Sequence, residues 1–196
     1  MSNIDQHLKD ISEIRSMMER SSKVLSLSGL SGVSAGVVAI AGVIFAQWIH
    51  TRVPPENVRM YLVLDTLVVL VLALGLSALF SARMAKKKGL PLWTNTAKHL
   101  LTDLSIPLGA GGALCLALVV KDAFSLIPGT MLVFYGLALV SGSKYALKEL
   151  RYFGFIQLGL GILAIFFTRE GLNIWAIGFG AMHIAYGLWM FFRYEM

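Results

Sequence analysis

Six long apolar stretches constrain this chain more than any other feature of its sequence. A helix needs about 20 mostly apolar residues to cross roughly 30 Å of hydrocarbon, and each stretch is near that length. None shows the alternation of a membrane β-strand, so helices are expected. The sequence therefore predicts an all-α integral membrane protein with six transmembrane helices. Their approximate ranges are 25–49, 60–82, 99–120, 124–142, 149–168 and 172–192.

The composition excludes a soluble domain. Of the 196 residues, 57% are hydrophobic and only 14% are charged, whereas soluble domains carry about 25% charged residues. A soluble fold of this size could not cover so much apolar surface. The single cysteine, Cys115, excludes an intrachain disulfide, and its place in the third stretch favours a small buried apolar residue. We expect the first stretch to remain as an anchor, because it is too long for a signal peptide.

The basic residues predict how the chain is oriented. Lys and Arg are enriched in cytoplasmic loops of membrane proteins, and one set of loops and ends holds thirteen of them, against four on the other set. We therefore place both termini in the cytoplasm, and interpret the net charge of +6 as a topology signal rather than a nucleic-acid surface. The four outer residues are Arg52, Arg59, Lys121 and Arg169.

Residues 1–22 precede the apolar stretches and show a helical period. Their apolar side chains fall on one stripe, while charges fill the other face. We interpret this segment as an amphipathic helix on the cytoplasmic membrane surface. A docking helix for a cytoplasmic partner and a solvated tail are the alternatives. The stripe consists of Ile4, Leu8, Ile11 and Met18.

Residues 23–196 form the predicted six-helix domain, and their short connections predict three consecutive helical hairpins at about 23–83, 98–144 and 148–193. One glycine pattern recurs in each hairpin. In the second helix a Gly-Leu pair comes shortly before a basic residue, and in the first a glycine follows thirteen residues after a lysine. Small residues let membrane helices approach closely, so we predict packing positions; a substrate path or hinge is the alternative. The glycines are Gly36, Gly75, Gly111, Gly136, Gly161 and Gly187.

Polar side chains inside the membrane stretches are the candidate sites, because each costs free energy unless it is paired or hydrated. Asp103 lies about five residues from the predicted inner end of the third helix, where a basic residue could pair with it. A proton or cation site is the alternative. Asp65 lies similarly deep from the outer side, within reach of Arg59, Lys121 or Arg169.

Two further polar residues fall near the membrane midplane. Gln157 lies in the fifth helix and His183 in the sixth. A buried imidazole needs a hydrogen-bond partner, so we predict a bond between these two side chains. The alternative is that His183 carries a proton in a transport cycle.

Catalytic signatures are missing from the sequence. It contains no HExxH, GxSxG, CxxC or phosphate-loop motif, and no two metal-capable residues share a depth and a helical face. We therefore expect no enzyme activity, no cofactor and no metal.

The three glycine-marked hairpins resemble the HdeD-like acid-resistance membrane proteins, a six-helix family built from two-helix repeats. The resemblance rests on Gly36 with LGL at 74–76, Gly111 with YGL at 135–137, and Gly161 with YGL at 186–188. It implies a non-enzymatic protein of the bacterial inner membrane that is linked to stress. The chain departs from the family by its N-terminal helix and its KKKGLP loop, and no functional residue is transferred.

Two classes of function follow. The first is a non-catalytic membrane protein that acts in the lipid bilayer by assembly, as a homo-oligomer or through a cytoplasmic protein bound at residues 1–22. The alternative is a small-solute, ion or proton-linked transporter or channel with a path marked by Asp65, His183 and Asp103. The first is favoured, because no helix carries the polar stripe that a solute path needs.

Overall fold

The computed structural model describes residues 11, 28–89 and 93–195. In this part of the chain six helical segments are long and apolar enough to cross a membrane, so the prediction of an all-α multi-pass membrane protein is confirmed at this level. The predicted amphipathic helix at 1–22 lies outside the described residues apart from Ile11. The six segments are Gly29–Arg52, Pro55–Lys87, Asn95–Val120, Phe124–Gly142, Glu149–Phe166 and Thr168–Tyr194.

The first three segments are single helices, α2 (Gly29–Arg52), α3 (Pro55–Lys87) and α4 (Asn95–Val120). Proline at the first helical position starts α3, where its missing N–H is no loss. The hydroxyl of Thr94 starts α4 by accepting a hydrogen bond of 3.0 Å from the Ala97 N–H.

Of the other three segments, the fourth and the sixth are interrupted, whereas the fifth is a single α-helix. The fourth is a 3₁₀ turn followed by α5 (Ile127–Gly142), and the fifth is α6 (Glu149–Phe166). The sixth changes its helical type three times, since a π-helical stretch separates two α-helices. Its parts are η2 (Thr168–Glu170), α7 (Gly171–Trp175), η3 (Ala176–Ala181) and α8 (Met182–Tyr194).

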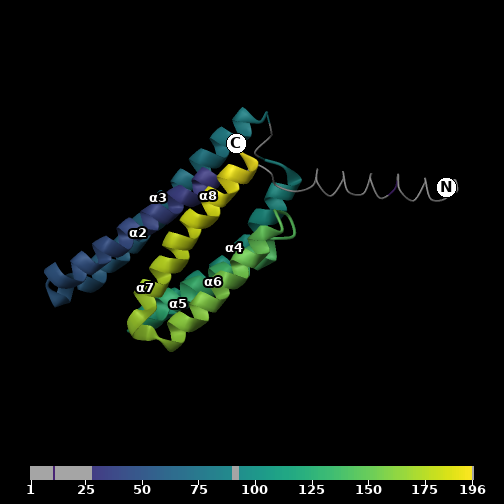
Figure 1. Cartoon of the computed structure of the whole chain (residues 1–196). Coiled ribbons are helices and arrows are strands. Elements are labelled where there is room, and N and C mark those ends of the chain that lie inside the picture. Colours follow the sequence, from purple (N-terminus) through teal and green to yellow (C-terminus); the bar gives the residue numbers. More distant parts are fainter. Residues whose placement is uncertain (1–10, 12–27, 90–92, 196) are drawn as a thin grey trace.

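Figure 1 shows how the helices are arranged. α2 lies beside α3, and α4, α5 and α6 form a second group in which α5 lies between the other two. The sixth segment joins the groups: α7 contacts α5 and α6, whereas η3 and α8 pack closely along α2. The last helix of the bundle is therefore shared between the first helix and the α5–α6 pair.

Glycines form the closest helix crossings. Along α2 and the sixth segment, a Cβ added to Gly36 would lie 2.6 Å from the Gly180 carbonyl oxygen, and one added to Gly187 would lie 2.6 Å from the Val33 nitrogen. Such distances leave no room for a side chain, so the backbones themselves are in contact. Close backbone approach of this kind is how membrane helices gain packing energy without a hydrophobic driving force.

A second glycine crossing joins α5 to α6. A Cβ on Gly136 would lie 2.7 Å from the Gly154 carbonyl oxygen, and one on Gly161 would lie 2.6 Å from the Val133 nitrogen. Four of the six predicted packing glycines thus lie in these two crossings.

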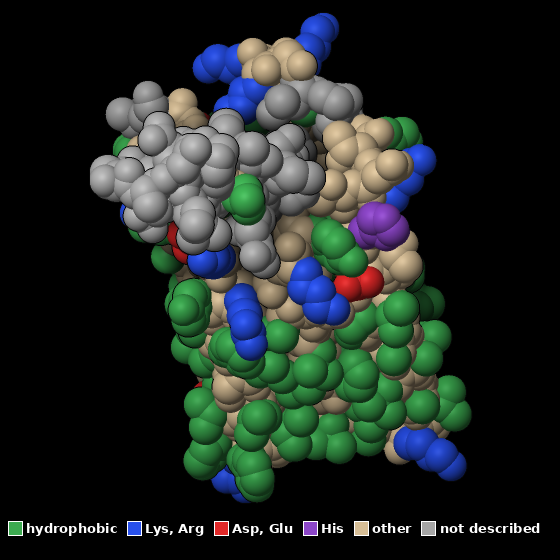
Figure 2. All heavy atoms as spheres, turned by 90° about the vertical axis from the view of Figure 1, so that its right-hand side faces the viewer, with side chains coloured by type: hydrophobic (Ala, Val, Ile, Leu, Met, Phe, Trp, Pro, Cys, Tyr) green, Lys and Arg blue, Asp and Glu red, His purple; other side chains and the backbone are tan. Residues whose placement is uncertain are grey.

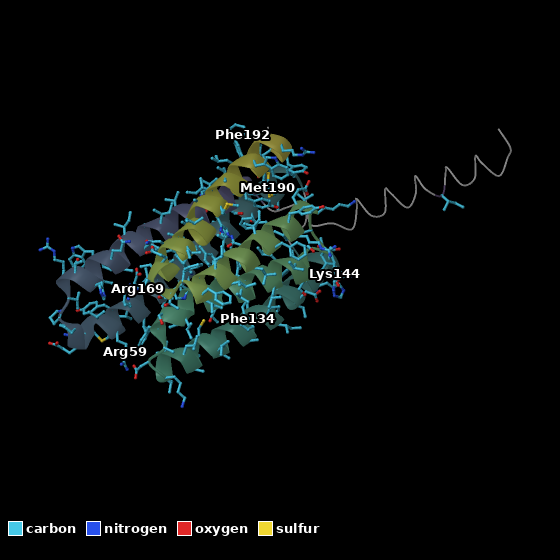
Figure 3. The ribbon with its side chains drawn as sticks, turned by 60° about the horizontal axis from the view of Figure 1, so that its bottom comes forward. Arg59, Phe134, Lys144, Arg169, Met190 and Phe192 are labelled. Carbon is cyan, nitrogen blue, oxygen red and sulfur yellow. The ribbon has the colours of Figure 1, made fainter. Side chains whose placement is uncertain are left out.

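The remaining two predicted glycines differ from them and from each other. Gly111 on α4 faces the side chain of Phe134 on α5, a residue labelled in Figure 3. A Cβ on Gly75 would meet no atom within 4 Å. The prediction that Gly75 packs against a neighbouring helix is therefore wrong for the described part of the chain, because this flank of α3 faces away from the bundle.

The surface separates apolar from basic residues. In the face shown in Figure 2, hydrophobic side chains cover a continuous zone, and Lys and Arg lie above it and at its lower edge. α3 is the extreme case, since no residue of its most apolar 18-residue window is buried within the chain. A zone of this kind is the surface that a bilayer would cover.

Candidate functional site

A backbone carbonyl in the π-helical stretch is the centre of the most buried polar cluster. The oxygen of Gly178 accepts a hydrogen bond of 2.8 Å from Nε2 of Gln157 and one of 2.9 Å from Nδ1 of His183. Gln157 is fully buried and His183 is nearly so. A π-turn holds an extra residue, and such turns are frequent at functional sites.

The acceptor fixes the tautomer of His183. A carbonyl oxygen can only accept, so Nδ1 carries a proton and donates it to Gly178. The other ring nitrogen, Nε2, lies 2.8 Å from the hydroxyl of Tyr135. In the neutral imidazole this nitrogen is an acceptor, and the tyrosine hydroxyl therefore donates to it.

Tyr135, Gln157, Gly178 and His183 together form a polar node that joins three segments. Tyr135 comes from α5, Gln157 from α6, and the other two residues from the last segment. The predicted direct bond between Gln157 and His183 is wrong, because both side chains donate to the carbonyl oxygen of Gly178 instead of bonding to each other.

Aromatic rings enclose the node. The His183 ring centroid lies 4.9 Å from that of Phe153 in an edge contact, and 5.6 Å from that of Phe179 in a stacked one. Phe179 also contacts Tyr135 and Trp175. The last segment thus has two faces: Gly180 and Gly187 approach α2, whereas the rings of Phe179 and His183 contact α5 and α6.

Two buried polar atoms near the node have no hydrogen-bond partner among the described residues. They are Oε1 of Gln157 and Nε1 of Trp175, an acceptor and a donor. An unpaired buried polar atom costs about 1–3 kcal/mol. These two atoms are the remaining hydrogen-bonding capacity that the cluster could offer to a small polar molecule.

Asp103 lies away from the node, at the predicted inner end. Its carboxylate pairs with Lys144 at 3.7 Å, and the two side chains are 26% and 70% exposed. Figure 3 shows Lys144 at the opposite end of the bundle from Arg59 and Arg169. An ion pair this exposed contributes little, about 0–1 kcal/mol.

Asp65 lies on α3 near the predicted outer end. Among the described residues it makes no ion pair, because the nearest base in sequence, Arg59, is engaged elsewhere. Arg59 pairs with Asp122 at 2.5 Å and lies over the Phe124 ring at 5.3 Å. None of the three bases expected within its reach, Arg59, Lys121 and Arg169, therefore pairs with Asp65 in the described part of the chain.

The proposed solute path through Asp65, His183 and Asp103 is not assembled into one site. The two carboxylates belong to different helices and opposite ends of the bundle, and the histidine bonds to neither of them. Across the described ranges, no three His, Cys, Asp or Glu side chains gather as metal ligands would. The geometry of the polar node can hold three helical segments in register.

Sequence reasoning found two members of the node and missed two. Tyr135 stands in the repeated Tyr-Gly-Leu phrase, and a buried tyrosine hydroxyl normally needs a partner, so its signal was present. Gly178 had none, because its carbonyl becomes an acceptor through a π-turn that no side-chain pattern marks. A comparison of the chain with protein-family models, curated proteins and solved structures found no match.

Proposed function

We propose that this chain is a polytopic protein of the bacterial inner membrane that acts without catalysis, by assembling with a partner in the bilayer or at its surface. The observation that carries the proposal is the polar node. Apart from Oε1 of Gln157, the side-chain donors and acceptors of the node bond within it, inside a shell of aromatic rings, which favours a role in holding helices together. Both glycine crossings leave equally little space for a solute.

The orientation and repeat form part of the same proposal. Three hairpins, an N-terminal interfacial helix and two cytoplasmic ends would place most basic residues on one side of the membrane. The described bases support this arrangement: Arg83, Lys86 and Lys98 lie in the terminal turns of their membrane segments, and Lys144 follows the end of its own. The HdeD-like resemblance implies the same compartment and a link to stress.

A proton-linked or small-solute transporter is the second candidate, and one observation favours it. The unpartnered Oε1 of Gln157 and Nε1 of Trp175 lie beside an ionisable histidine and a π-turn. Irregular helices that expose unpaired polar groups are typical of transporter binding sites. In that function, water would reach the node in at least one state of the protein.

Water accessibility separates the two functions. Single cysteines replace Leu104, Leu158 and Met182 in a Cys115→Ser background, so that each thiol lies next to one polar residue. The protein in proteoliposomes is then treated with a membrane-impermeant maleimide added on both sides. Trp93→Cys serves as the accessible control, because Trp93 is 71% exposed beyond the end of the membrane segments.

The assembly function predicts labelling of the control alone. Labelling at all three interior positions would contradict that function and support transport. A variant that labels only in detergent, and not in the bilayer, counts as protected.

A further inference from the structure

The carboxylate of Asp65 occupies an unusual place on α3. Its neighbours Leu62 and Val69 belong to the half-buried stripe that packs on α2, where Val69 fills the space above Gly42. Asp65 lies at the edge of this stripe and is partly exposed. Asp65 is six residues beyond Arg59 along α3. It therefore lies about 9 Å further along the helix axis, inside the apolar zone.

No positive charge of the described chain neutralises this carboxylate. Arg59 is held by Asp122 and Phe124, and the other described bases stand at the ends of the membrane segments. An ionised aspartate inside a bilayer costs free energy unless a counter-charge or water meets it. The chain therefore presents a negative group at membrane depth toward whatever covers α3.

The same side of α3 carries a second feature of a helix contact. Moving inward from Asp65 at intervals of three or four residues, the helix presents an exposed flank. Gly75 is part of it, and a Cβ there would meet no atom of the described residues within 4 Å, so a neighbouring backbone could approach. We call this the α3 flank; it consists of Asp65, Val68, Leu72, Gly75 and Leu79.

We propose that the α3 flank docks a transmembrane helix of a partner protein that carries a lysine or arginine level with Asp65. Charge complementarity supplies the recognition, and Gly75, about 15 Å further along the axis, lets the two backbones come close. Polar groups and small residues are the two features by which membrane helices associate. This inference rests on the proposed assembly function and names the chemistry of its partner.

A second copy of this chain fits the flank less well. Its described bases lie at the segment ends, so none reaches the depth of Asp65 from a parallel neighbour. The Asp122 of each copy already holds the Arg59 of the same copy.

The test uses the full chain in phosphatidylcholine vesicles with a designed transmembrane peptide as the probe. The peptide has about 24 leucine and alanine residues and one lysine at the depth of Asp65; a second peptide has leucine at that position. Energy transfer between labelled protein and labelled peptide measures their association. We expect the lysine peptide to bind about tenfold more tightly than the leucine peptide.

Two pairs of variants locate the contact. Asp65→Asn should abolish the preference for the lysine peptide, whereas Asp103→Asn, which removes the paired carboxylate, should keep it. Gly75→Leu should weaken binding severalfold, whereas Gly112→Leu should not, although both positions are open within the chain. Since a Cβ at either position meets no described atom within 4 Å, both variants are expected to fold.

Equal binding of the two peptides, or equal effects of Asp65→Asn and Asp103→Asn, would overturn the proposal. Self-association of the protein that needs Asp65 and excludes the peptide would also overturn it, because the occupant would then be a second copy. If the lysine peptide shows no preference for the α3 flank while the interior cysteines stay protected from the maleimide, the assembly function stands, and only the proposed basic partner helix is rejected.

Discussion

Replacing Gly161 by alanine should separate the α5–α6 pair. The added Cβ would lie 2.6 Å from the Val133 nitrogen and 2.9 Å from the Gly129 carbonyl oxygen. These are backbone atoms of α5, which cannot rotate away as a flexible side chain could. The two helices must therefore move apart, and the contacts along the whole crossing weaken.

The magnitude follows from a matched substitution on the same helix. Overpacking a closely packed site costs about 1–3 kcal/mol. The Cβ of alanine at Gly159, two residues earlier, would meet no atom within 4 Å in the described ranges. Both variants gain the same helix propensity of about 1 kcal/mol over glycine. The difference between them therefore isolates the clash at Gly161, and we expect Gly161→Ala to be less stable than Gly159→Ala by about 1–3 kcal/mol.

Reversible unfolding in mixed micelles, driven by a rising fraction of an anionic detergent and followed by tryptophan fluorescence, measures the free energy of unfolding of both variants. Equal stability of Gly161→Ala and Gly159→Ala would refute the close α5–α6 crossing.

Two further substitutions test the hydrogen bonds that join the helices. Tyr135→Phe leaves Nε2 of His183 without its donor and should lower the free energy of unfolding by about 1–3 kcal/mol, whereas Tyr152→Phe on the exposed surface should change it little; equal losses would contradict the node. Glu195→Ala removes the carboxylate that accepts from the Gly29 N–H at the start of α2, which should cost about 1 kcal/mol. Faster hydrogen exchange confined to the first turn of α2 would reveal this loss, and unchanged exchange there would contradict the contact.

The six membrane segments could be predicted because their signal is local. Length and apolarity decide whether a segment crosses a bilayer, and α5, for example, ends at Gly142 as its sequence suggests. The packing partner of a helix is not encoded in this way. Gly75 and Gly136 occupy the same position of the repeat pattern, yet Gly136 contacts a backbone and Gly75 faces away from the described helices.

The node could be predicted only in part for the same reason. His183 and Gln157 were recognisable as polar groups that need partners, but the acceptor that both use belongs to the backbone. It is available through the π-turn at Gly178, and a π-turn depends on how the last segment fits between α2 and the α5–α6 pair. Tertiary packing therefore determines which hydrogen bonds form in the node, whereas the sequence pattern determines how deep its polar side chains lie in the membrane.

A water-edited solid-state NMR spectrum of the histidine side chains in bilayers tests the central claim most directly, since the interior is proposed to be dry and its polar groups to bond to one another. The ring nitrogens of His183 should show the Nδ1-protonated tautomer and receive no magnetisation from water, whereas the exposed His50 and His99 should receive it and serve as internal controls. Water transfer to His183 as strong as that to His50 and His99, or a proton on its Nε2 in place of Nδ1, would contradict the account.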